Sequence, residues 1–168
     1  MSSLKYLGLG NKHNIIVNAR SDAFFQTGAS DMNSFFSPSP IFLNNGIAII
    51  RIVIGLLLIY HGIEIFTPAT MNAYLEWDMF KGPYGKFLVY LGKGSEFFTG
   101  ILLLLGLLTR VSALVIIGNF CYITFFVGEG RFWYQEQHPF MFALFGILFL
   151  FTGPGACSVD RILFSNKA

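Results

Sequence analysis

The sequence predicts an all-α integral membrane protein: a four-helix bundle with both termini in the cytoplasm. Of its 168 residues, 54% are hydrophobic and only 12% are charged, with 20 phenylalanines. A soluble domain has about 25% charged residues, so this composition indicates lipid as the main solvent. Apolar runs of about 20 residues, enough to cross roughly 30 Å of hydrocarbon, recur along the chain.

Charge and cysteine content exclude several classes of protein. The net charge of +2 and the absence of a dense basic run argue against a nucleic-acid partner. The two cysteines, Cys121 and Cys157, form no CxxC pair, which argues against a thiol–disulfide catalyst. No glycine-rich phosphate loop or nucleophile elbow occurs, so we expect no intrinsic cofactor, and a redox reaction would need a partner that carries one.

Residues 1–45 differ from the rest of the chain. They are rich in Ser, Asn and Gly and contain a short apolar patch, Ile15-Ile16-Val17. This composition predicts a polar tail that is disordered or lies on the membrane surface, with partner docking as the alternative. The remainder divides into a membrane domain over 46–163 and a short tail over 164–168.

The first predicted span, 46–66, carries Arg51 near its start and His61 and Glu64 near its end. His61 and Glu64 are three residues apart and therefore share one helical face. Arg51 lies roughly 15 Å from His61 along the helix axis, at the opposite membrane surface. Thr67-Pro68 is a typical helix end.

The second predicted span, 87–108, contains Lys93 and Glu96. Helical periodicity places small residues, including Thr99 and Gly100, on the same side as Glu96. Charged side chains inside a membrane usually face the interior of a bundle, and small residues let helices approach closely. This stripe is therefore predicted to face the other helices.

The third and fourth predicted spans are 111–127 and 136–151. Only Thr109-Arg110 separates the second from the third, which predicts a tight antiparallel hairpin. The segments 67–86 and 128–138 are predicted to be loops, and their aromatic residues suit the membrane–water boundary. Ser158 is a candidate cap for a short helix that follows, with Asp160 in its first turn.

Basic residues predict the orientation. With four spans, seven of the 11 Lys and Arg residues lie on the side of the termini. Because positive charge favours the cytoplasm, both termini are predicted to be cytoplasmic.

This topology brings polar residues from separate spans to the outer half of the bundle: His61, Glu64, Lys93, Glu96 and His138. Three interpretations stay open: ion pairs that fix helix register, a binding site for a quinone headgroup or a small anion, or a metal site without a recognised ligand spacing. We assign no metal ligands. Arg51 and Arg110 are predicted to reach lipid headgroups.

Several motifs resemble the DoxX family of small four-helix bacterial membrane proteins. They are Arg51, the His61-Gly62 pair, the pattern E-x-x-x-G-x-L-L-L-L-G-x-L-T-R over 96–110, and GPGACSVD over 153–160. The resemblance covers about 46–163. It implies a multi-pass protein of the bacterial inner membrane. For some members it implies the membrane subunit of a thiosulfate:quinone oxidoreductase or of an oxidoreductase complex that answers oxidative stress.

The function expected from this resemblance is a quinone-linked membrane subunit with a soluble or membrane-bound redox partner. Quinone is then the expected cofactor, and whether the chain is itself catalytic stays open. The alternatives are a non-catalytic scaffold or assembly factor, and a small-solute transporter. Homo-oligomerisation is also left open.

Overall fold

The computed structural model describes residues 39–164, whose helices belong to one compact unit that begins at Phe42. Most of the predicted N-terminal tail lies outside the described residues, as do 165–168. The first described helix begins at Leu43, so the last three residues of the predicted tail are helical. Everything below concerns this one unit.

The described residues are helical and contain no strand, as predicted. The α-helices are α2 (Leu43–Gly62), α3 (Pro68–Leu75), α4 (Gly85–Leu105), α5 (Thr109–Tyr122), α6 (Gln137–Thr152) and α7 (Val159–Phe164). Two short 3₁₀ helices, η1 (Ile63–Phe66) and η2 (Asp78–Phe80), and a π-helix, η3 (Ile123–Val127), complete the set.

Within the described range, three helical stretches are long and apolar enough to cross a membrane: Leu43–Phe66, Gly85–Leu105 and Thr109–Val127. This confirms the prediction of apolar membrane helices. The next helix, α6, is also apolar but has only 16 residues, fewer than the roughly 20 that a bilayer needs. The fourth span therefore stays a prediction.

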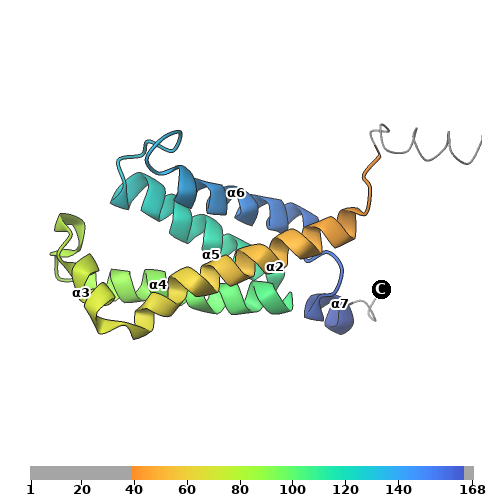
Figure 1. Cartoon of the computed structure of the whole chain (residues 1–168), viewed down its shortest axis with the longest axis horizontal. Helices are drawn as coiled ribbons and strands as arrows, with labels where there is room; N and C mark the ends of the chain where they lie inside the picture. The colour runs from red at the N-terminus through yellow and green to blue at the C-terminus, as the bar shows by residue number, and fades with distance from the viewer. Residues whose placement is uncertain (1–38, 165–168) are drawn as a thin grey trace, which may run out of the picture. The chain divides into compact units, whose positions relative to one another are not determined.

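The four longest helices of the described range, α2, α4, α5 and α6, run alternately in opposite directions (Figure 1). The end of α2 therefore lies at the same end of the unit as the starts of α4 and α6, and we call this the cavity end. The opposite end, where α2 and α5 begin and α7 lies, is called the clamp end, after the contacts that Arg51 and residues 156–160 make there. α3 lies at the cavity end (Figure 1).

Glycines let α2 and α4 pack backbone against backbone. A Cβ on Gly55 would lie 2.8 Å from the Leu104 nitrogen, and one on Gly62 would lie 2.3 Å from the Phe97 nitrogen. Gly100 meets α2 in the same way. Together with the burial of Glu96 and Thr99, this confirms the predicted inward stripe on α4.

Two predicted boundaries need correction. The hairpin between α4 and α5 turns over residues 106–108, because Gly106 adopts a left-handed conformation (φ 66°) that ends α4, and Thr109 already belongs to α5. The segment 67–86 is not a simple loop, because Pro68 occupies the first turn of α3 and η2 follows. Proline suits that position because its missing N–H would have no partner there.

Candidate functional site

A cavity of about 230 Å³ lies at the cavity end. Most of its wall is aromatic or aliphatic and comes from α3, η2, α4, α5 and η3. The apolar and aromatic lining residues are Tyr74, Trp77, Phe80, Leu88, Val89, Phe120, Tyr122, Ile123, Val127 and Pro139. Its other side chains are polar: His61, Lys93, Glu96, Asn119 and His138.

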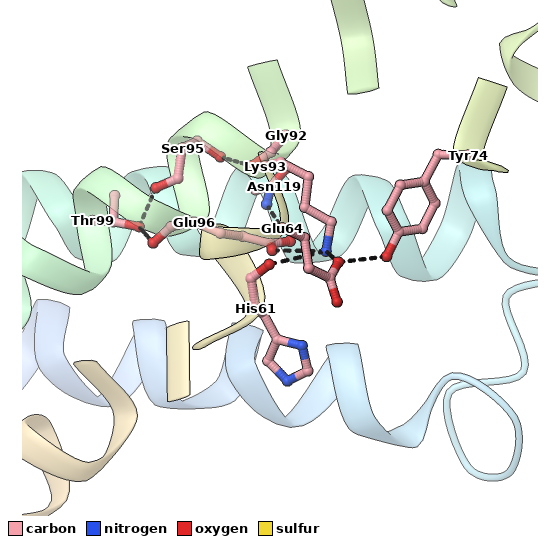
Figure 2. Close-up of polar contacts among 9 residues, drawn as sticks. All are labelled: His61, Glu64, Tyr74, Gly92, Lys93, Ser95, Glu96, Thr99 and Asn119. Atoms are coloured by element: carbon pink, nitrogen blue, oxygen red, sulfur yellow. Dashed lines mark hydrogen bonds and ion pairs between the residues drawn. The ribbon is translucent and has the colours of Figure 1, made fainter. Parts of the chain in front are cut away.

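Four of the five residues that we predicted as a site therefore line one cavity, and the fifth, Glu64, bonds to one of them. Lys93 is the centre of this polar group (Figure 2). Its Nζ lies 2.9 Å from Glu64 Oε2 and 3.2 Å from Glu96 Oε2. It also donates to the backbone oxygen of His61 at 3.5 Å. These contacts join the end of α2 to the middle of α4.

The three charged side chains of the polar group differ in how deeply they are buried. The Glu96 side chain is 4% exposed, that of Lys93 is 15% exposed, and that of Glu64 is 31% exposed. Two carboxylates surround one ammonium, so the group carries an excess of one negative charge when all three are ionised. A small anion would be repelled by this excess, which disfavours that part of the sequence-based hypothesis.

Two members of the polar group were not predicted from the sequence (Figure 2). The Tyr74 hydroxyl donates to Glu64 Oε2 at 2.7 Å, and its ring centroid lies 5.0 Å from Lys93 Nζ. Asn119 Nδ2 donates to Glu96 Oε1 at 3.5 Å. Asn119 could have been predicted as a site residue, because a lone amide inside an apolar span usually faces the bundle interior. Tyr74 could not, because in the sequence it looks like an ordinary aromatic residue of the membrane interface.

The Tyr74 hydroxyl stays protonated at neutral pH. Burial, followed by its hydrogen bond to the Glu64 carboxylate, raises the pKa of Tyr74 above the usual 10.0. Tyr74 is therefore a permanent donor to Glu64 and leaves fewer of the Glu64 lone pairs for other partners.

The rings of His61 and His138 lie in contact with one another at the cavity end. Their ring centroids are 5.3 Å apart at an interplanar angle of 66°, and both rings lie edge-on to Phe142. Among the described residues, none bonds to the ring nitrogens of His61 or His138. The nitrogens of both rings can therefore bond to a ligand. No group of three His, Cys, Asp or Glu side chains in the described range is arranged to hold a metal ion.

The π-helix η3 shapes one wall. The Gly128 nitrogen donates to the Ile123 oxygen at 2.7 Å, the i→i+5 bond that defines this geometry. The wider turn places Ile123 and Val127 in the lining of the cavity. Isolated π turns in α-helices are frequent at functional sites.

Arg51 lies at the clamp end and requires a correction. It is fully buried, so it does not reach lipid headgroups. Its guanidinium donates to the Leu103 oxygen at 3.0 Å and to the Cys157 oxygen at 2.9 Å, with a longer contact of 3.5 Å to the Ala156 oxygen. The arginine thereby ties α2 to the end of α4 and to the segment before α7.

Asp160 completes this arrangement. Its two carboxylate oxygens accept from the nitrogens of Leu108 and Thr109, at 2.7 and 2.8 Å, and so cap the start of α5. The Arg161 nitrogen donates to Ser158 Oγ at 3.3 Å, which confirms Ser158 as the predicted cap of α7. We call Arg51, Gly106 and residues 156–160 the clamp. Arg110 lies outside the clamp and is exposed, and its binding to lipid stays a prediction.

The fold and the cavity define a class: a helical membrane protein with a largely apolar cavity, lined on one side by polar residues, at one end of its apolar helices. The family description that matches the sequence is DoxX, over residues 46–129. The chain belongs to the DoxX family. The match ends before α6, so the extension of the domain to 163 stays a prediction.

A relative from Haemophilus influenzae, described as "Uncharacterized protein", is 29% identical over 144 residues, which is 80% of this chain and 100% of the relative. No solved structure matches the chain.

Proposed function

We propose that the cavity binds the headgroup of a membrane quinone, and that the chain is the quinone-binding membrane subunit of an oxidoreductase complex. The observation that carries this proposal is an aromatic-walled cavity in a membrane protein, with two imidazoles at its polar side that make no hydrogen bond to any described residue. Ligand pockets commonly combine an apolar lining with a few polar groups that fix orientation.

The size of the cavity fits a small ring. At about 230 Å³ it is smaller than the roughly 300–1,000 Å³ of pockets for drug-sized ligands. A headgroup can enter it, while an isoprenoid tail would have to remain in the lipid. A compact, nearly flat headgroup also suits walls formed by Tyr74, Trp77 and Phe120.

The polar residues would hold the headgroup and supply protons. His61 and His138 can donate hydrogen bonds to its carbonyl oxygens, since within the described range neither imidazole has a hydrogen-bond partner. Lys93, held by Glu64 and Glu96, can store or pass a proton beside them. When bound, a quinone supplies two-electron, two-proton redox chemistry, and the electrons would be exchanged with a separate redox subunit.

The proposed setting is the bacterial inner membrane, with four spans and both termini in the cytoplasm. In this arrangement α6 is the fourth span, the membrane domain extends over 46–163, and the cavity end faces outward. The bias of basic residues toward the termini supports this orientation.

A scaffold role is the second candidate, and one observation favours it. The polar side chains around Lys93 are bonded to one another: Lys93 contacts both carboxylates, and Glu96 also accepts from Asn119. Such a network can fix the pairing of helices without any ligand. Only a binding measurement separates the two roles.

Tryptophan fluorescence provides that measurement. The chain has two tryptophans, and Trp77 lines the cavity while Trp133 is 69% exposed. In Trp133→Phe, titration with a short-chain ubiquinone in detergent should quench Trp77 with saturation. The matched variant Trp77→Phe should show only weak, non-saturating quenching of Trp133. Equal, non-saturating quenching in both variants would reject quinone binding and favour the scaffold role.

A further inference from the structure

A second cavity, of about 590 Å³, lies at the clamp end, at the opposite end of the helices from the proposed quinone site. It is formed where α5 begins, α6 ends and α7 packs beside them. Its lining includes the turn over 153–155 and the side chains of Arg110 and Arg161.

The charge of this cavity is positive. Arg110 comes from α5 and Arg161 from α7, and both are exposed. Within the described residues neither guanidinium has an acidic partner. Asp160 also lines the cavity, but both of its oxygens accept backbone N–H groups of α5. The two guanidinium groups and the Asp160 carboxylate together carry a net charge of +1.

The floor of the cavity is held in place by the backbone. The Ala156 nitrogen donates to the Asn44 oxygen at 2.9 Å, and a Cβ on Gly155 would lie only 2.7 Å from the same oxygen. This fixes the 153–155 turn against the start of α2. The two arginines therefore project from elements whose mutual positions the clamp determines.

The cavity is bordered by exposed apolar side chains. Leu108, Val111 and Phe164 line it and are 45%, 53% and 57% exposed. A site with cationic groups beside exposed apolar residues, at the ends of membrane helices, suits an amphipathic anion better than a freely soluble one.

We propose that this cavity binds the phosphate of an anionic phospholipid headgroup. The planar guanidinium matches phosphate geometry and can bond to it with two N–H groups. Basic pockets between membrane helices are known sites for anionic headgroups. The bound lipid would join α5 to α7, while its acyl chains would lie against the apolar border. The proposal uses no residue of the quinone site.

Native mass spectrometry of the full chain in detergent tests the proposal. Delipidated protein is titrated with phosphatidylglycerol or with phosphatidylcholine of the same chain length. Phosphatidylglycerol should bind more tightly, and Arg110→Gln and Arg161→Gln should each weaken its binding about tenfold. The control is Arg131→Gln, which removes a guanidinium paired with Glu129 at the cavity end and should leave lipid binding unchanged.

A parallel titration with inorganic phosphate distinguishes the source of the anion. The lipid should bind more tightly than phosphate alone, because only the lipid covers Leu108 and Val111. Equal affinity for both would assign the site to free phosphate and overturn the lipid proposal. The proposal would also be overturned if Arg131→Gln lost as much affinity for phosphatidylglycerol as the two cavity variants, or if the wild type bound phosphatidylglycerol and phosphatidylcholine equally. Thermal unfolding of each variant in lipid-free detergent shows whether a loss reflects misfolding.

Discussion

At the clamp end, Arg51 is fully buried and donates to backbone carbonyls of α4 and of the segment before α7. At the cavity end, Lys93 lies between two carboxylates beside an open cavity. Both are cations inside apolar helices, but only the second adjoins space that a ligand can occupy. A charged residue in a membrane helix is therefore a candidate ligand site only when its surroundings leave room for the ligand.

This difference divides the family-like motifs into two groups. Arg51, Gly106 and Asp160 build the clamp, and their partners are backbone groups. His61 and Glu96 line the cavity together with Lys93, which lies just before the motif over 96–110 and contacts the Glu96 carboxylate through its side chain. We expect substitutions in the first group to reduce stability and those in the second to reduce binding.

The largest expected effect is that of Arg51→Met. The change removes the guanidinium that donates to the carbonyl oxygens of Leu103, Ala156 and Cys157, and with it the bonds that join α2 to α4 and to the segment before α7. Loss of such a network costs about 3–5 kcal/mol, so little folded protein should be recovered. Size-exclusion chromatography and thermal unfolding in detergent measure this. Arg131→Met is the control: Arg131 is exposed, lies outside the clamp and the clamp-end cavity, and forms a surface ion pair with Glu129, so the variant should unfold close to the wild type.

A smaller but clear loss is expected for Gly106→Ala. Gly106 has φ 66°, and a Cβ there would lie 1.7 Å from Arg51 Nη1 and 2.7 Å from Ser158 Cβ. The left-handed conformation alone costs an alanine about 1–2 kcal/mol, and displacement of Arg51 adds to this. Gly118→Ala is the matched control, since nothing lies within 4 Å of its Cβ position in α5. An equal fall in unfolding temperature for both would contradict the clamp.

Asp160→Ala should destabilise the chain by about 1–2 kcal/mol. The change removes the acceptor of two N–H groups at the start of α5 and the favourable interaction of a carboxylate with that helix end. Asp160→Asn should recover part of the loss, because asparagine also caps helices. Chemical denaturation in detergent measures both, and identical stability of the two variants would contradict the capping role.

The smallest effect is expected for Tyr74→Phe, which keeps the ring beside Lys93 and removes the hydroxyl bonded to Glu64. The cost should be about 0.5–1.5 kcal/mol. Since the folded pKa of Tyr74 is raised above 10.0, this contribution is fully present below pH 10 and is lost as the pH rises through the folded value. The stability difference between wild type and variant should thus be constant between about pH 6 and pH 9, because this range lies below the pKa of Tyr74. A difference that varies within that range would show that another group controls the bond.

The sequence was a good guide wherever periodicity or hydropathy decides the outcome. The inward stripe of Glu96, Thr99 and Gly100 follows from the helical repeat, and the apolar helices follow from composition. Convergence of His61 and His138 followed from alternating helix directions. These features depend on local order and on a simple up-and-down chain path.

What the sequence could not predict depends on contacts between distant segments. Arg51 resembles a headgroup ligand until the chain over 156–160 is seen to fold back over it, because no local pattern encodes that return. Tyr74 joins the polar group only because α3 turns it toward Glu64. The end of α4 moved from the predicted residue 108 to Leu105, because Gly106 adopts a left-handed conformation, and a side chain at Gly106 would collide with Arg51.

The most direct test of this division is quinone binding by Glu96→Gln in the Trp133→Phe background, with thermal unfolding measured on the same sample. Glutamine keeps the size of the side chain, and Lys93 keeps its contact with Glu64 at 2.9 Å. We predict an unfolding midpoint close to that of the parent and quinone affinity weakened about tenfold, because Lys93 loses one of the two carboxylates that position it beside the headgroup. Unchanged quinone affinity together with a loss of stability as large as that of Arg51→Met would show that the cavity-end charges are structural, and would contradict the division.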